Sequence, residues 1–177
     1  MTNQATLDAE ACLTHLYNSY RGSVYRYCRG QLRSNDEADD AVQTTFLRAF
    51  AALRRGVKPD FEAAWLFKIA HNVCLSRRLA EARRARVECP RDFEQLQELA
   101  AGPERAERDE LSGLGCALAS MPANLRQVIL LREWQGLSYG EIAEVLELSR
   151  SAVEARIFRA RRDLRAHLEA EEKGHEH

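Results

Sequence analysis

Little in this sequence interrupts a helix. Its 177 residues include only four prolines and nine glycines, and alanine, leucine, glutamate and arginine are its commonest residues. No stretch alternates apolar and polar residues in the way that a half-buried strand does. The composition therefore predicts an all-α fold.

Signals for secretion and membrane insertion are also missing. The first residues contain no basic segment followed by an apolar core, and no apolar run approaches the length that crosses a bilayer. We therefore expect a cytoplasmic protein without membrane insertion.

The sequence offers no catalytic or metal-binding motif. Its five cysteines are odd in number and form no CxxC pair, which indicates neither a disulfide framework nor a zinc site. Cys12, Cys28 and Cys74 lie among apolar positions, so buried, reduced thiols are expected. His175 and His177 at the end of the chain are too few to form a good metal site. Because a phosphate-binding glycine loop and an HExxH motif are absent too, we expect no enzyme, no metal and no cofactor.

The arginines are clustered, although the formal net charge is only -1. Two basic faces separated by acidic segments favour a protein that touches DNA in two places. The first cluster contains Arg77, Arg78, Arg83, Arg84 and Arg86, and the second contains Arg156, Arg159, Arg161, Arg162 and Arg165.

Apolar spacing and turn residues predict two small helical domains joined by a flexible acidic linker. In the first, a turn at Gly22 is expected to separate two helices. The third helix is capped by Ser34 or Asn35 and ends at Gly56, and a fourth starts near Phe61. The expected boundaries are an N-terminal helical bundle at 7–86, a linker at 87–103, a helix-turn-helix domain at 104–168 and a frayed tail at 169–177.

Residues 137–165 have the spacing of a helix-turn-helix. Ser138 and Glu141 can form a capping box on the first helix, and Val153 and Ile157 on the second helix face inward. An arginine-rich solvated helix at the end of a bundle is the alternative. If the helix reads DNA, the best base-reading candidates are Arg150, Ser151 and Glu154, while Ser149 caps the helix and Arg156, Arg159, Arg161 and Arg162 hold phosphates.

Glu147 occupies the turn between these two helices, where such motifs usually have glycine. If the backbone there is left-handed, glutamate should cost about 1 kcal/mol relative to glycine.

A second surface is indicated by the stretch "DDAVQTTF". Asp40, Gln43, Phe46 and Leu47 recur at three- and four-residue spacing, so they share one helix face. An acid, an amide and an exposed aromatic residue together are typical of a protein-docking stripe. The alternative, which periodicity alone favours, makes Phe46 and Leu47 core residues and leaves the two polar residues solvated.

Three segments follow one another along the chain: "DEADDAVQTTFLRAF", then "AAWLFKIAHNVCLSRR", then the stretch that runs from "MPANLRQVILL" to "ARIFRARRDL". Taken in this order, they resemble the two domains of extracytoplasmic-function (ECF) sigma factors of bacterial RNA polymerase, which belong to the sigma-70 family. The resemblance covers residues from about 16 to 168, and several motifs in the right order are more specific than one helix-turn-helix. It implies a promoter-specificity factor that directs transcription initiation.

The resemblance assigns roles to individual residues. It implies that Asp40, Gln43 and Phe46, with Leu47 beside them, dock on the clamp helices of the largest polymerase subunit. The helix-turn-helix would read the minus-thirty-five element, and the linker would thread the active-site cleft unless it is a merely disordered acidic spacer. The residues implied in capturing and opening the minus-ten element are Lys58, Phe61, Trp65, Lys68 and Asn72, with Arg77 and Arg78 on duplex phosphates.

Aromatic faces that stack on unpaired bases and cations that follow the backbone suit promoter opening, with roughly 1–3 kcal/mol per stacked base. Trp65 as an ordinary core residue is an equal alternative, and Phe67 is expected to pack inside. The chain departs from the family pattern at Ser151 and Ala152, where Gly-Thr is common, and after Asn72, where an acid is common.

The implied partners are core RNA polymerase, through its clamp helices and flap region, promoter DNA and an anti-sigma factor wedged between the two domains. The free protein is expected to be a monomer. A stand-alone dimeric helix-turn-helix regulator is the main alternative, and it predicts tight binding to a palindrome without polymerase. The arginine clusters disfavour a helical adaptor that binds only protein.

Overall fold

The structure is a computed structural model that describes residues 2–32, 34–88 and 113–174. Every regular element within these ranges is helical, which confirms the predicted all-α fold. The expected linker falls almost entirely outside the described residues, as does the expected start of the second domain at Glu104.

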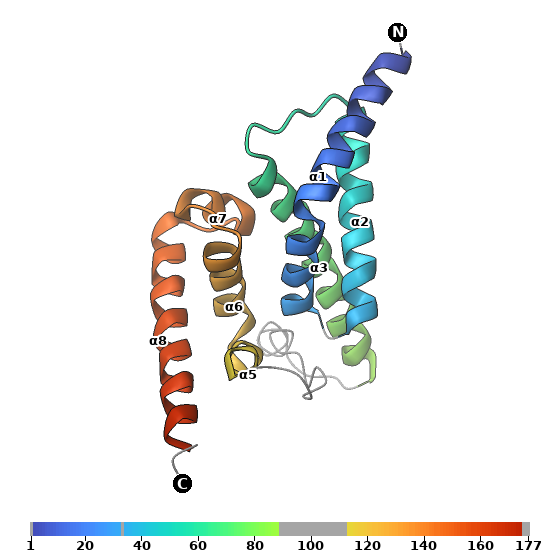
Figure 1. Ribbon diagram of the computed structural model, residues 1–177. Coiled ribbons are helices and arrows are strands. Elements are labelled where there is room, and N and C mark those ends of the chain that lie inside the picture. Colours follow the sequence, from blue (N-terminus) through green and yellow to red (C-terminus); the bar gives the residue numbers. More distant parts are fainter. Residues whose placement is uncertain (1, 33, 89–112, 175–177) are drawn as a thin grey trace.

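Three long helices form the N-terminal unit and lie side by side (Figure 1): α1 (Thr2–Gln31), α2 (Asn35–Arg54) and α3 (Glu62–Glu88). Ser34 caps α2 as predicted, because its hydroxyl oxygen accepts a 3.1 Å hydrogen bond from the Glu37 amide. Gly56, with a φ of 89°, follows the end of α2, where a residue with a side chain would be strained. The helices bury a common apolar core that includes Leu16, Tyr27 and Phe67.

The turn expected at Gly22 is wrong. α1 runs without a break through this residue, which is exposed on the helix surface. One glycine inside a helix costs only about 1 kcal/mol relative to alanine, and the buried Leu16 and Val24 on either side hold the two halves on one core.

Four short elements and one long helix form the C-terminal unit: α5 (Gly113–Ser120), α6 (Ala123–Ile129), the π-helical turn η1 (Leu130–Trp134), α7 (Tyr139–Leu146) and the long α8 (Arg150–Gly174). Gly136, with a φ of 67°, ends the stretch formed by α6 and η1, as the sequence predicts. α8 continues to Gly174 and so includes residues of the tail expected at 169–177, while residues 175–177 lie outside the described part of the chain.

The two units are in direct contact. α7 packs on α3, α6 packs on the end of α1, and buried residues of both units belong to one continuous apolar cluster. α8 lies on the side of the C-terminal unit that faces away from the three long helices (Figure 1).

Candidate nucleic-acid interface

The helix-turn-helix is built by local caps. The Ser138 hydroxyl accepts a 3.3 Å hydrogen bond from the Glu141 amide, and the Glu141 carboxylate accepts a 2.7 Å bond from the Ser138 amide, which completes the predicted capping box. Ser149 caps α8 in the same way, since its hydroxyl accepts a 3.2 Å bond from the Ala152 amide. These bonds satisfy helix-terminal amides and fix where each helix begins.

Glu147 forms the turn in a left-handed conformation, with φ 54° and ψ 45°. Its amide donates to the Ala143 carbonyl and so closes α7. Among the described non-glycine residues, it is the one with a positive φ. The turn therefore has the conformation for which glycine is usual, and this chain builds it with a charged side chain.

The outward face of α8 presents the predicted base-reading residues. Ser151 and Glu154 are exposed, and the Arg150 Nε donates a 3.2 Å hydrogen bond to Glu154. Val153 and Ile157 are buried on the opposite side, as predicted. The side chains of Arg150, Ser151 and Glu154 are therefore accessible to solvent before DNA binds.

Phe158 is a candidate contact that the sequence analysis missed. It lies four residues after Glu154 on the same outward face, and 71% of its surface is exposed. The inner face of α8 is already filled by Val153, Ile157 and Ala160, so a large aromatic residue at 158 has no role in the core. A large apolar residue outside the inner face of the helix was the feature of the sequence that could have identified this contact.

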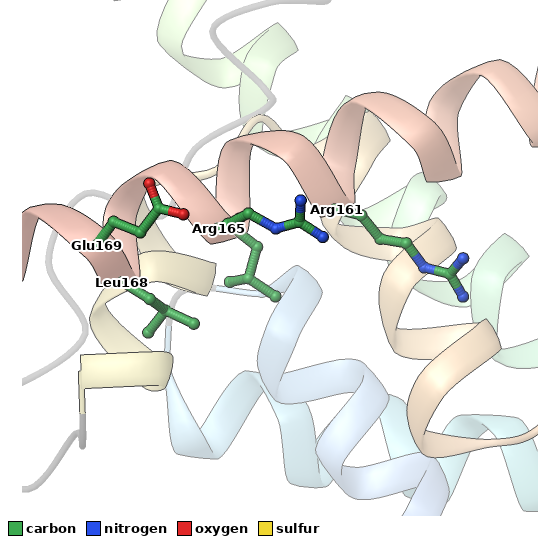
Figure 2. A pocket seen from close by; sticks show the side chains of 5 residues that line it. Arg161, Arg165, Leu168 and Glu169 are labelled. Carbon is green, nitrogen blue, oxygen red and sulfur yellow. The ribbon is translucent and has the colours of Figure 1, made fainter.

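The arginines of α8 are not equivalent. Arg159 and Arg162 are exposed, whereas Arg156 is half-buried, and burial lowers its pKa. Arg161 donates a 2.6 Å bond to the Glu133 carboxylate, which raises the pKa of Arg161 and ties α8 to η1. Arg161 also lines a pocket along the end of α8 (Figure 2), together with Leu164, Arg165, Leu168 and Glu169. A structural role thus competes with the phosphate contact predicted for Arg161.

The residues expected at the minus-ten element gather around the start of α3. Phe61 is 66% exposed, and Lys58 and Asn72 are exposed as well. Trp65 is half-buried against the core, so it is neither a plain core residue nor a fully exposed stacking residue. Phe67 packs inside, as predicted. Lys68 lies 3.6 Å from a carboxylate oxygen of Glu147 in the C-terminal unit.

Arg77 and Arg78 point toward neighbouring helices. Arg77 lies 3.8 Å from the Asp40 carboxylate and donates a 3.4 Å bond to the Thr44 hydroxyl, both on α2. Arg78 donates a 3.5 Å bond to the Gln31 side chain on α1. The predicted contact with duplex phosphates would require these bonds to be exchanged.

A polar pair, formed by buried Tyr27 and half-buried His71, lies beside Arg78. The Tyr27 hydroxyl and His71 Nδ1 are 3.1 Å apart. Burial, and then the charge of Arg78, lower the His71 pKa from 6.5 to about 4, although the Glu147 carboxylate opposes this shift. His71 is therefore neutral near pH 7, and it packs where the two units meet.

The docking stripe on α2 differs from its prediction at one residue. Asp40 and Gln43 are exposed and Leu47 is 69% exposed, but Phe46 is only 5% exposed. The expectation of an exposed aromatic anchor at Phe46 is wrong, because the Tyr17 ring covers it with 4.9 Å between ring centroids. Leu47 is the apolar residue that this face presents.

The cysteines and possible ligands form no metal centre within the described ranges, where no three His, Cys, Asp or Glu residues come together. Cys28 and Cys74 are buried, and a hydrogen bond between them and then burial raise the Cys74 pKa well above 9.0. No helix of the described chain has the length and apolar character to span a membrane.

Two family models match the chain, one for each unit. Sigma-70 region 2 matches residues 16–84, and sigma-70 region 4 matches residues 112–164. The two matches follow the order of the motifs on which the resemblance rests.

Individual sigma factors are similar over most of the chain. The RNA polymerase sigma factor CnrH of Cupriavidus metallidurans is 39% identical over 150 residues, which are 76% of this chain and 75% of CnrH. The ECF RNA polymerase sigma factor SigE of Mycolicibacterium smegmatis is 30% identical over 86% of this chain, which spans only 60% of the length of SigE.

A solved structure has the same fold. The sigma factor RpoE from Bartonella quintana, in complex with the anti-sigma factor NepR, superposes with a TM-score of 0.70 at 22% identity, covering 88% of this chain and 96% of RpoE. With both sigma-70 regions in place and a relative as similar as CnrH, this chain belongs to the sigma-70 family as an ECF sigma factor of RNA polymerase.

Proposed function

We propose that this sigma factor binds core RNA polymerase through the outward face of α2. The observation that carries the proposal is the contrast between Phe46, which packs inside, and Leu47, which is 69% exposed between polar neighbours. The large apolar side chain of Leu47, beside the polar Asp40 and Gln43, suits a protein interface, because docking would remove its surface from water. The clamp helices of the largest subunit are the proposed partner of this face.

The proposal places promoter opening at the start of α3. Phe61 is exposed enough to stack on an unpaired base, and Lys58, Lys68 and Asn72 can follow the strand. Trp65 keeps part of its ring at the surface while its remainder supports the core. Arg77 and Arg78 are proposed to contact duplex phosphates after they release their present partners on α2 and α1.

Recognition of the minus-thirty-five element is assigned to α8. Arginine pairs with guanine and glutamate accepts from the cytosine amino group, which suits Arg150 and Glu154, and the Phe158 ring suits a thymine methyl. Arg159 and Arg162 are the proposed phosphate contacts, with Arg156 beside them and Arg161 in a mainly structural role.

Region 2 is proposed for residues 7–86, and region 4 for 104–168, with the acidic linker between them. The protein is proposed to act in the cytoplasm, where promoter DNA is, and without catalysis of its own. The family matches favour this account over a stand-alone dimeric regulator.

An anti-sigma factor is a further proposed partner, because the structurally similar RpoE was solved with one. Affinity capture of the tagged protein from unstimulated cells should recover such a partner along with polymerase. Recovery of polymerase subunits only would contradict this part of the proposal.

The docking face is tested by titrating labelled protein with core polymerase. Asp40→Ala and Leu47→Ala should each weaken binding about tenfold, as expected for residues near the centre of an interface. Asp39→Ala is the matched control, because this exposed acid lies about 100° around the helix from Asp40. Equal affinity of all three variants and the wild type would overturn the assignment.

A further inference from the structure

The outer face of α3 continues beyond the residues proposed for the minus-ten element. Successive residues of an α-helix are rotated by about 100°, which places Lys68 and Asn72 within about 20° of Leu79 around the helix axis. Leu75 and Arg83 lie within about 40° of the same line, and these five residues are called the outer stripe below. The proposed function uses the stripe only as far as Asn72, although more than half of the 27-residue helix follows it.

Two leucines of the outer stripe lie at the surface. Leu75 and Leu79 are each 38% exposed, and neither belongs to the buried core, whereas Val73 and Cys74 on the opposite side of the helix do. The leucines are four residues apart, which is about 6 Å along the axis, so they form one continuous apolar step. An apolar step on a face that is otherwise polar indicates a contact made by that face.

The charges of α3 favour a nucleic acid as the partner of this stripe. All three glutamates of the helix, at positions 62, 81 and 88, lie about 100° or more from Leu79 around the axis. Lys68 precedes the two leucines and Arg83 follows them, so the stripe has a cation on each side of its apolar step. A polyanion matches this pattern, and the stripe is continuous with the face proposed to hold the opened strand.

Arg83 is the cation best placed to hold a phosphate. Its side chain is exposed and has no hydrogen-bond or ion-pair partner among the described residues. Arg77 and Arg78, in contrast, lie about 100° or more from Leu79 and are bonded to α2 and α1. Arg83 can therefore contact DNA without giving up a contact within the protein.

The spacing of these residues fits one groove of duplex DNA. The major groove of B-DNA is about 12 Å wide and admits an α-helix. Leu75 and Leu79 are about 6 Å apart along α3, and Arg83 lies about 6 Å further on. Two apolar side chains can thus reach base edges within the groove while the arginine reaches its phosphate wall. The apolar group that a base edge presents there is the thymine methyl.

The duplex that this part of α3 can reach is the spacer between the two promoter elements. Leu75 and Leu79 lie about 21 Å and 27 Å along the helix from Phe61, which is proposed to stack on an unpaired base. At 3.4 Å per base, these distances correspond to about six and eight base pairs. α3 is therefore long enough to extend from the opened strand into DNA that stays double-stranded.

We propose that Leu75, Leu79 and Arg83 form a further promoter contact. The leucines contact thymine methyl groups in the duplex upstream of the minus-ten element, and the arginine holds a phosphate beside them. Part of the spacer thereby belongs to the sequence that the protein recognises. The proposal rests on the proposed sigma function, since it extends the face assigned to promoter opening.

The leucines are tested with holoenzyme assembled from core polymerase and the full chain, on promoter fragments randomised over about ten base pairs upstream of the minus-ten element. The wild type should enrich thymine at two positions about two base pairs apart. Leu75→Ala should lose the enrichment nearer the opened element, and Leu79→Ala the other. Leu7→Ala, which truncates a 50% exposed leucine on α1, is the matched control and should keep both.

Replacing each selected thymine by uracil isolates the methyl group. The replacement should weaken binding of wild-type holoenzyme about fourfold, as expected when the burial of one methyl group is lost. The leucine variant that has lost its preference at that position should bind uracil and thymine equally. Equal binding of the two bases by the wild type would overturn the methyl contact.

Arg83 is tested by salt titration of the same complexes. Arg83→Ala should weaken binding to all fragments alike and lower the slope of log K against log salt by about 1, because one phosphate contact is lost. Arg84→Ala is the matched control, since this exposed arginine lies about 100° around the helix from Arg83. A slope for Arg83→Ala equal to that of the wild type would overturn the phosphate contact.

Three outcomes distinguish the ways in which the proposal can fail. Weaker binding of Leu75→Ala or Leu79→Ala to core polymerase without DNA would overturn it and assign the leucines to a protein interface. A wild-type holoenzyme that selects both promoter elements but no base in the spacer would overturn this contact alone. A holoenzyme that selects neither element would overturn the proposed function, and this contact with it.

Discussion

The Phe46 ring meets the Tyr17 ring edge to face, with 4.9 Å between the centroids, while the next residue along the chain, Leu47, is 69% exposed. Two adjacent residues of the "DDAVQTTF" helix therefore have different roles, since Phe46 packs in the core and Leu47 lies on the surface. Phe46 joins α1 to α2 and sets the position of the face on which Leu47 lies.

Substitution should separate these two roles. Phe46→Ala leaves a cavity against Tyr17 and should lower the free energy of unfolding by about 3–5 kcal/mol. Leu47→Ala should change it by less than about 0.5 kcal/mol, because little buried surface is lost. Urea unfolding measures both values. A loss of stability in Leu47→Ala as large as that in Phe46→Ala would show that residue 47 belongs to the core.

The left-handed turn predicts an order of stability at residue 147. Glu147→Gln and Glu147→Gly both remove the carboxylate that faces Lys68, but only glycine relieves the backbone conformation. The glycine variant should therefore be about 1 kcal/mol more stable than the glutamine variant in thermal or urea unfolding. Equal stabilities would mean that the turn is not strained.

The neutral His71 predicts that stability depends on pH. Its pKa is lowered from 6.5 to about 4 in the folded chain, so the unfolded chain binds a proton first as the pH falls. The folded state should lose no more than about 2 kcal/mol between pH 7 and pH 5 from this residue. His71→Gln should lose less than the wild type over the same interval, and the difference between the two isolates His71 from the other histidines. Parallel losses in the two proteins would contradict the assigned burial.

The exposed face of α8 predicts two kinds of effect on DNA binding. Phe158→Ala should weaken binding to a selected minus-thirty-five duplex and relax its sequence preference, with folding unchanged because the ring is 71% exposed. Arg159→Ala should weaken all sequences alike and lower the slope of log K against log salt by about 1.

Arg161→Ala is the control for Arg159→Ala, since Arg161 is already bonded to Glu133. It should change the salt slope less and the stability more. If Arg161→Ala lowered the salt slope more than Arg159→Ala does, the DNA would lie on a different face of α8.

Local structure was the part that could be predicted from sequence. Ser34, Ser138 and Ser149 cap their helices as predicted, because a cap depends on residues only three positions apart. The spacing of the two helices placed the turn at Glu147 but left its backbone conformation open, and the structure shows that it is left-handed. Gly22 was misinterpreted because core packing on both sides outweighs the local preference of one glycine.

Contacts between distant residues could not be predicted from sequence. Nothing in the spacing relates Gly30 to Leu130, or Lys68 to Glu147, since helical periodicity shows only which residues share a face. Phe46 and Leu47 illustrate the same limit. Both were placed on one face, and the covering ring of Tyr17 decides which of them is buried.

The central claim is that this protein directs core RNA polymerase to promoters. Run-off transcription with purified core polymerase and a library of promoter fragments tests it most directly, comparing the wild type with Asp40→Ala/Leu47→Ala and with the control Asp39→Ala. The account predicts transcripts that require the protein, persist with the control and are lost with the double variant. Specific DNA binding by the protein alone, with no transcript dependent on it, would contradict the account.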